Sequence, residues 1–368
     1  MLRISSFARL VLIGGLAAMV ATACASSGDG TPSTSSVQCG NTGLTGAGAT
    51  FPAPLYQKAF FDYQAQCSAV QVNYQPIGSG GGITAFKSKT VDFAASDVPM
   101  GSADITAAGG PDTLTQIPTT LGVIAIAYNV SGVDKLVLDG PTLVGIYMGS
   151  INMWNAQEIT NLNPGVSLPN KSITVYHRSD GSGTSYHFTD YLSKISSDWK
   201  TQTGSPNKSP NWPKFAHAQS ASGNPGVAQG ISSTDGSLGY VELAYVVQNN
   251  MKQAYLVNAA GKKVQASVDG ATASAATNTS VSPTNFSITN ANCDKCYPIA
   301  AFSWIILYTN YSDANKGKSV VYLFKWLVTN GQSDGKDLQY APLPSAVQQL
   351  ALTNLKTVKA GGTTVLSS

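Results

Sequence analysis

Three short segments combine glycine with serine or threonine, which suits them to holding an anion. They are residues 45–52 (TGAGATFP), 78–82 (GSGGG) and 181–185 (GSGTS), and each follows a strand-like run and precedes a helical pattern. A helix start presents unpaired backbone N–H groups at the positive end of its dipole, and glycine lets the backbone approach a ligand closely. Such turns are also common in α/β folds, so a single one has a purely structural interpretation.

Arg178 stands just before the third of these segments and is the only arginine after Arg9. Its planar, permanently charged guanidinium suits a tetrahedral oxyanion better than a lysine ammonium does. A lone arginine can also be a surface residue or form a structural ion pair, and Asp180 is placed to pair with it. The two roles are compatible, because a paired guanidinium is held in one orientation.

Asp97 ends the strand-like run 91–96 (VDFAAS), a position where an aspartate often serves as a turn or cap residue. A carboxylate that faces an anion site has a use only if the anion carries a proton. It then accepts a hydrogen bond from that O–H and repels anions that have none. In the first segment, Thr50 is a candidate N-cap and Pro52 fits the first helical turn.

The segments that must position these residues alternate between strand-like and helical patterns. The alternation predicts an α/β fold with mixed, largely parallel sheets flanked by helices. We expect residues 266–290, rich in Ala, Ser, Thr and Asn, to form a surface excursion. The strand-like runs are 44–51, 70–78, 91–96, 121–130, 142–150, 173–179, 238–248 and 301–310, and the helical patterns are 54–64, 82–89, 184–195 and 320–329.

The N-terminus has the pattern of a secretory signal over residues 1–24. Arg3 and Arg9 are followed by an apolar run over 10–20, which is too short for a membrane span, and then by small residues before Cys24. ATAC resembles a bacterial lipobox, so we expect lipid attachment at Cys24, with ordinary secretion as the alternative. Residues 25–39 have the composition of a flexible tether.

The charge and cysteine content restrict partners and compartment. Removing Arg3 and Arg9 leaves 20 of 22 basic residues against 19 acidic ones, so the exported chain is nearly neutral and we expect no nucleic-acid partner. Four further cysteines in an exported chain favour disulfides. Cys39 and Cys67 could join two neighbouring segments. Cys293 and Cys296 could form a local ring, a redox motif or half a metal site, and we favour a disulfide because no second CxxC is present.

The motifs in their order and spacing resemble the periplasmic phosphate-binding proteins of bacterial ABC transporters. The similarity rests on GAGATFPAPLY, NYQPIGSGGGI, VDFAASDVP and HRSDGSGTS and extends over nearly all of residues 43–350. The resemblance implies a two-lobed periplasmic-binding-protein fold of type II with phosphate in the cleft. It implies a first lobe of residues 40–127 and 303–368 and a second of 128–302, with crossovers near Tyr128 and Phe302.

The resemblance also implies a set of phosphate ligands. Thr50 and Phe51 would donate backbone N–H groups, Thr50 and Ser79 hydroxyls, and Asp97 would accept the phosphate proton. Asp180 would hold Arg178. The second lobe would contribute Arg178, Ser182, Gly183 and Thr184. The family often has GSSGG where this chain has GSGGG, so only the second serine is lost.

These observations predict a phosphate receptor that acts outside the cell membrane rather than an enzyme. Its partners would be inorganic phosphate and the permease subunits of an ABC transporter. We expect a monomer in the periplasm or on the outer face of the cell membrane. It would be attached to the membrane only through its lipid anchor and would need no metal or cofactor. Arsenate, protonated like phosphate, is an alternative ligand, and an adhesin or signalling role stays open. A hydrolase built on Ser333 in GQSDG is disfavoured, because that motif follows a helix instead of a strand.

Overall fold

Nine strands form the main sheet in the computed structural model, which describes residues 37–366. Along the sheet the order is β2-β1-β3-β12-β4-β8-β6-β7, and β9 pairs with β4 outside this path. The smaller sheets are β11-β10-β5 and β13-β14-β15. The strands are β1 Leu44–Gly48, β2 Val72–Gln75, β3 Phe93–Ser96, β4 Leu114–Asn129, β5 Val137–Leu138, β6 Thr174–Arg178, β7 Ala218–Ala221, β8 Ser237–Glu242, β9 Lys252–Gln253, β10 Tyr255–Val257, β11 Lys263–Val264, β12 Ala300–Tyr308, β13 Asn310–Tyr311, β14 Lys359–Ala360 and β15 Thr363–Thr364.

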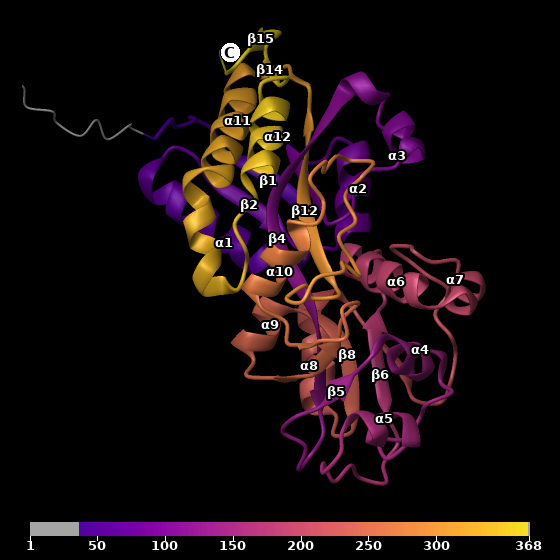
Figure 1. The fold of residues 1–368 in the computed structure, drawn as a ribbon. Helices are drawn as coiled ribbons and strands as arrows, with labels where there is room; N and C mark the ends of the chain where they lie inside the picture. Colours follow the sequence, from indigo (N-terminus) through magenta and orange to yellow (C-terminus); the bar gives the residue numbers. More distant parts are fainter. Residues whose placement is uncertain (1–36, 367–368) are drawn as a thin grey trace, which may run out of the picture. The chain divides into compact units, whose positions relative to one another are not determined.

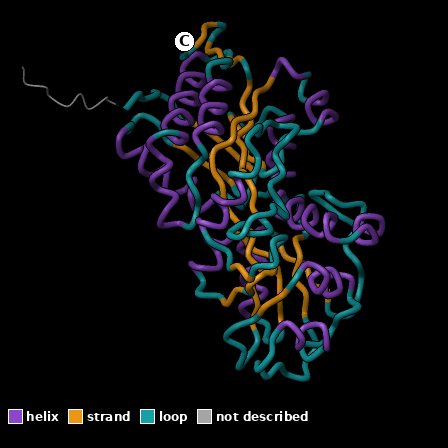
Figure 2. Tube along the Cα trace, viewed as in Figure 1, coloured by secondary structure: helices purple, strands orange, loops and turns teal. Residues whose placement is uncertain are grey.

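Helices cover the strands, as Figure 2 shows, with the strands running through the interior of the fold. The α-helices are α1 Ala53–Gln66, α2 Ser79–Lys87, α3 Ser102–Ala107, α4 Gly140–Met148, α5 Gln157–Leu162, α6 Gly183–Ile195, α7 Ser197–Thr203, α8 Gly223–Ser233, α9 Leu243–Gln248, α10 Val268–Ala275, α11 Ala314–Val328 and α12 Ser345–Leu355. Two 3₁₀ segments, η1 Pro111–Thr113 and η2 Asn330–Leu338, complete the described part of the chain. The predicted mixed α/β architecture is therefore confirmed.

Strands β4 and β12 run side by side through the centre of the fold (Figure 1). β4 pairs with β12 up to Val123 and with β8 from Ile124 onward, both antiparallel. The sheet thus has a first half, with β1, β2 and β3 parallel, and a second half, with β6, β7 and β8 parallel. The predicted crossover residues Tyr128 and Phe302 lie in these two central strands.

The continuous apolar character of β4 and β12 follows from their central position. All of β12 except Tyr308 is buried, and β4 is buried over most of its length. Helices α11 and α12 pack against each other and against β4 on the first half. A strand covered on both faces has no polar side to alternate with, which explains why the two segments read as unbroken apolar runs.

Three local predictions are wrong. The predicted strand 238–248 ends at Glu242, and its second half forms α9, which Glu242 caps by accepting from the Ala244 N–H at 2.9 Å. Residues 142–150 form most of α4 instead of a strand, because Asp139 caps the helix by accepting from the Thr142 N–H at 2.8 Å and Gly149 ends it in the left-handed region at φ +78°. Part of 266–290 forms α10, whose Ala271 and Ser274 are buried against the central strands. Small side chains allow this close packing, so a composition typical of a surface segment here forms part of the interior.

The predictions for the N-terminus fall largely outside the described residues. They comprise the signal sequence over 1–24, lipid attachment at Cys24 and the tether up to residue 36. Within the described part of the chain, no helix is long and apolar enough to cross a membrane.

Candidate anion-binding site

Helix starts from opposite halves of the sheet meet at Ser79, the first residue of α2. The Ser79 hydroxyl oxygen accepts from the backbone N–H of Gly183, the first residue of α6, at 3.1 Å. It also accepts from the Asp97 N–H at 3.3 Å. The fold therefore brings together three residues that sequence reasoning had placed in one site, although Ser79 and Gly183 lie 104 positions apart.

Two glycines are required by this close approach. A Cβ at Gly183 would lie 2.6 Å from the side chain of Asp97, and one at Gly78 would lie 2.2 Å from Asp180 Oδ2. Gly78 also has φ +87°, in the region that favours glycine. Gly80 continues the contact, since its N–H donates to the Gly181 carbonyl at 2.8 Å.

Arg178 ends β6 with a buried guanidinium, 3% exposed, directed at the start of α6. Its Nε donates to Asp180 Oδ1 at 2.7 Å and its Nη2 donates to Asp180 Oδ2, while Nη1 lies 3.4 Å from Thr184 Oγ1. Burial raises the pKa of Asp180, but the hydrogen bonds and charge of Arg178 outweigh burial and leave that pKa below its ordinary value. The ion pair predicted from the spacing is therefore present, and it holds one edge of the fork so that Nη1 faces the site.

Asp97 follows β3 and is buried, with 1% of its surface exposed. Its Oδ1 accepts from the Ser303 hydroxyl at 2.8 Å, and its Oδ2 lies 3.4 Å from Ser79 Oγ. Burial is the main cause that raises the pKa of Asp97 to about 7, against the lowering effects of Ser303 and Arg178. A carboxyl group in such a place readily shares a proton with a ligand.

Thr50 does not cap α1 as predicted. The helix begins at Ala53 without a side-chain cap, and Thr50 Oγ1 accepts from the N–H and Nδ2 of Asn224 at 3.1 and 3.0 Å. Tyr245 and Tyr340 donate to the carbonyl oxygens of Thr50 and Phe51, both at 2.6 Å. Within residues 37–366 no hydrogen bond uses the backbone N–H of Thr50 or Phe51, so both donors are free to bind a ligand.

Ser182 and Thr184 complete the second wall. Ser182 caps α6 by accepting from the Ser185 N–H at 3.0 Å, and both Ser182 and Thr184 are fully buried. The helix thus starts directly at the site, where the Gly183 N–H donates to Ser79 and the positive end of the dipole lies.

Sequence reasoning missed three buried residues that touch this group: Asn224, Ser303 and His187. Asn224 is the second residue of α8, which follows β7 and begins at Gly223, the same strand-turn-helix pattern as the three segments that were recognised. Ser303 is the single serine or threonine in the apolar run of β12. His187 lies one helical turn after Gly183, and its Nε2 is 2.8 Å from the Asp97 carbonyl oxygen, a pairing that only the folded chain reveals.

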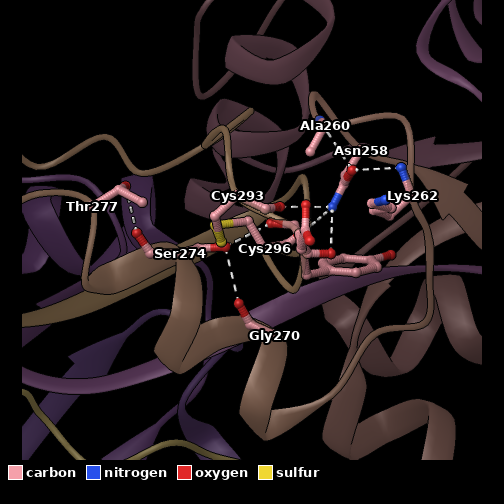
Figure 3. The surroundings of a disulfide bond; sticks show 10 residues. Asn258, Ala260, Lys262, Gly270, Ser274, Thr277, Cys293 and Cys296 are labelled. Carbon is pink, nitrogen blue, oxygen red and sulfur yellow. Dashed lines mark hydrogen bonds between the residues drawn. A yellow bond between two sulfur atoms is a disulfide. The ribbon is translucent and has the colours of Figure 1, made fainter.

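Both expected disulfides are present, Cys39–Cys67 and Cys293–Cys296. The first joins the residues before β1 to the end of α1. At the second, shown in Figure 3, Asn258 Nδ2 donates to the carbonyl oxygens of Cys293 and Cys296, each at 3.0 Å. A buried amide thus holds the carbonyl groups of this small ring in place.

Ser333 lies in η2, exposed, and donates to the Asn330 carbonyl at 2.9 Å. The segment follows α11 and opens no α-helix, so the strand-turn-helix context of a nucleophile elbow is not met. Among the described residues, no group of three or more His, Cys, Asp or Glu side chains could hold a metal ion.

The geometry as a whole offers many donors and one acceptor. The donors are the unused backbone N–H groups of Thr50 and Phe51, Arg178 Nη1 and the hydroxyls of Ser79 and Thr184, and the acceptor is the Asp97 carboxyl. Such a set can bind an oxyanion that has a proton to donate.

Comparison with known proteins agrees with this chemistry. The family model of the PBP superfamily domain matches residues 26–324, most of the chain. Among curated proteins, the phosphate-binding protein PstS of Xylella fastidiosa (strain 9a5c) is 40% identical over 321 residues, 86% of each chain. That of Haemophilus influenzae is 41% identical over 318 residues, 85% of this chain and 92% of the relative.

The fold has a matching neighbour among solved structures. A high affinity periplasmic phosphate-binding protein, PfluDING, solved with phosphate, superposes with a TM-score of 0.68 at 22% identity, over 86% of this chain and 99% of its own. The chain belongs to the PBP superfamily and, within it, to the family of the PstS phosphate-binding proteins. Its fold is the two-lobed α/β fold of that superfamily, as the motifs predicted.

Proposed function

We propose that this chain binds inorganic phosphate outside the cell membrane and delivers it to an ABC transporter permease for import. The observation that carries the proposal is the buried Asp97 carboxyl among hydrogen-bond donors from both halves of the sheet. The relatives named phosphate-binding protein PstS support the same ligand. No other acceptor carboxylate is needed, since monohydrogen phosphate has one proton to give at neutral pH.

The proposed ligands divide between the two lobes. Thr50, Phe51, Ser79 and Asp97 come from the first lobe, and Arg178, Ser182, Gly183 and Thr184 from the second. Each hydrogen bond to a charged group contributes about 1.5–3 kcal/mol net. Several such bonds, less the cost of association and of lobe closure, suffice for micromolar or tighter binding.

Selectivity follows from the proton. Sulfate has none, so above the pKa of Asp97 a sulfate oxygen would face the ionised carboxylate, with two like charges in contact. Arsenate is protonated like phosphate and satisfies the same contacts, so we expect it to compete.

The transport role rests on the family and on the N-terminal sequence. We propose that lipid attachment at Cys24 keeps a monomeric receptor at the outer face of the membrane, where the permease subunits are its partner. We propose lobe limits of residues 40–127 and 303–368 for the first lobe and 128–302 for the second. We propose that the chain acts as a receptor rather than an enzyme, since its relatives are named phosphate-binding proteins and Ser333 lies outside the strand-turn-helix setting of a nucleophile elbow.

A titration of the purified chain tests the proposed ligand. Phosphate, arsenate and sulfate are added in turn while tryptophan fluorescence is followed, after bound anion has been removed by unfolding, dialysis and refolding. At pH 8, where Asp97 is mostly ionised, we expect saturable changes with phosphate and arsenate at micromolar concentrations and much weaker binding of sulfate. No response to phosphate at millimolar concentration would overturn the proposed function.

A further inference from the structure

Asn224 lies between the two threonines that face each other across the site. It is the second residue of α8 and is fully buried. Its Nδ2 donates to Thr50 Oγ1 at 3.0 Å and to Thr184 Oγ1 at 3.1 Å, and its backbone N–H donates to Thr50 Oγ1 at 3.1 Å. One amide group therefore contacts a proposed phosphate ligand in each lobe.

The orientation of this amide is fixed by its other side. Asn224 Oδ1 accepts from the backbone N–H of Glu242 at 3.0 Å. A backbone N–H can only donate, so the oxygen of the amide must face it and the NH₂ must face the threonines. Both hydrogens of Nδ2 are then in use, one on each hydroxyl oxygen.

The consequence concerns the threonine protons. A hydroxyl has two lone pairs and one O–H. Thr50 Oγ1 accepts twice from Asn224, and Thr184 Oγ1 accepts from Asn224 and from Arg178 Nη1, the latter at 3.4 Å. With both lone pairs engaged, each hydroxyl has only its O–H left, and it can act toward a ligand only as a donor.

We propose that Asn224 is a positioning residue that fixes the hydroxyls of Thr50 and Thr184 as donors to the bound anion. The inference rests on the proposed function and extends it to a residue that touches no ligand itself. It also explains why a buried asparagine lies at this place: its amide makes the hydroxyls of two threonines from opposite lobes donate toward the ligand. Asp97 then stays the acceptor of the site, because the threonine oxygens have no lone pair left for a ligand proton.

The test is a double-mutant cycle measured by isothermal titration with phosphate. Asn224→Ala removes the two donors, and we expect phosphate affinity to fall roughly 10- to 100-fold. In the Thr50→Val/Thr184→Val background the same substitution should change affinity by about threefold or less, because the hydroxyls through which it acts are gone. Should the triple threonine–asparagine variant not fold, the cycle of Asn224→Ala with Thr184→Val alone should still show non-additive losses.

Asn163→Ala is the matched control. Asn163 is a buried asparagine that accepts from the Val137 N–H at 2.7 Å and donates to the carbonyls of Val137 and Ile159, both at 2.8 Å. Its substitution should lower the melting temperature and leave phosphate affinity within about threefold, since its role is structural only.

The outcomes separate the two proposals. Two results would overturn the role of Asn224 and leave the proposed function intact, provided that the wild type binds phosphate. One is a set of additive affinity losses in the cycle. The other is a loss of phosphate affinity in Asn163→Ala as large as that in Asn224→Ala. A wild-type chain that fails to bind phosphate would overturn the proposed function, and the inference with it.

Discussion

The pH dependence of sulfate binding reports the protonation of Asp97, because sulfate itself does not titrate near neutral pH, whereas phosphate does. Burial raises the pKa of Asp97 to about 7, so the group is neutral below that pH and negative above it. Sulfate can bind only when the carboxyl is neutral and donates its own proton. The apparent sulfate affinity then scales with the neutral fraction, which falls about tenfold between pH 6 and pH 8.

The perturbation is Asp97→Asn, which keeps the shape and supplies a permanent amide donor. We expect this variant to bind sulfate more tightly than the wild type does at pH 8. Because asparagine does not ionise, its sulfate affinity should lack the roughly tenfold fall between pH 6 and pH 8. Phosphate binding should weaken by roughly 10- to 100-fold, since a hydrogen bond to a charged acceptor is lost. The ratio of phosphate affinity to sulfate affinity therefore falls, because the variant binds sulfate more tightly and phosphate more weakly.

The assay is calorimetric titration of sulfate into wild type and Asp97→Asn at half-unit steps from pH 6 to pH 8. Taking the ratio of the two affinities at each pH removes the contribution of every other titrating group. A ratio that stays constant over this range, or sulfate discrimination unchanged in the variant, would refute the reasoning.

Three further predictions concern other parts of the chain. Arg178→Lys removes the fork held by Asp180, and we expect phosphate affinity to fall at least about 30-fold by calorimetry; a loss under threefold would contradict this. Burial lowers the pKa of His187, whose Nε2 lies 2.8 Å from the Asp97 carbonyl oxygen, so we expect phosphate binding to weaken as the pH falls through the ordinary value of about 6.5. His187→Gln keeps an N–H donor in this place, so its phosphate affinity should equal that of the wild type at pH 8. At pH 5.5 the variant should bind phosphate more tightly than the wild type does. Affinities of the two proteins that fall in parallel with pH would contradict this. Replacing Cys39 and Cys67 by serine should lower the free energy of unfolding in urea by about 3–4 kcal/mol, the value for a loop of 28 residues, and an unchanged unfolding midpoint would argue against it.

Residues whose partners are close in sequence were the easiest to predict. The pairing of Arg178 with Asp180 spans two positions, and the helix start after it was readable from the glycine and serine pattern. The resemblance then joined this segment to Ser79 and Asp97, which the structure brings into contact. Local chemistry and collinear motifs together were enough to predict the fold class.

Contacts between distant segments could not be derived in the same way. Thr50 was expected to cap α1, but its hydroxyl is taken by Asn224, which lies 174 positions away. His187 reaches the carbonyl of Asp97 across the site, and Ser303 reaches its carboxyl from a central strand. Helix propensity and capping rules concern neighbours along the chain, so a partner supplied by tertiary packing overrides them.

Two of the misassigned segments failed for a related reason. Residues 142–150 are apolar and partly β-branched, which suggested a strand, although Asp139 and Pro141 before them are helix-start residues. In α10 the buried Ala271 and Ser274 gave no apolar pattern, because their packing depends on the closeness of β4 and β12.

A high-resolution crystal structure of the chain with phosphate tests the central claim most directly. We expect the anion in contact with Thr50, Ser79, Arg178 and Thr184, and an Asp97 carboxylate oxygen about 2.5–2.7 Å from a phosphate oxygen, the distance of an O–H···O⁻ bond. Phosphate bound elsewhere, or bound here with Asp97 turned away from it, would contradict the account.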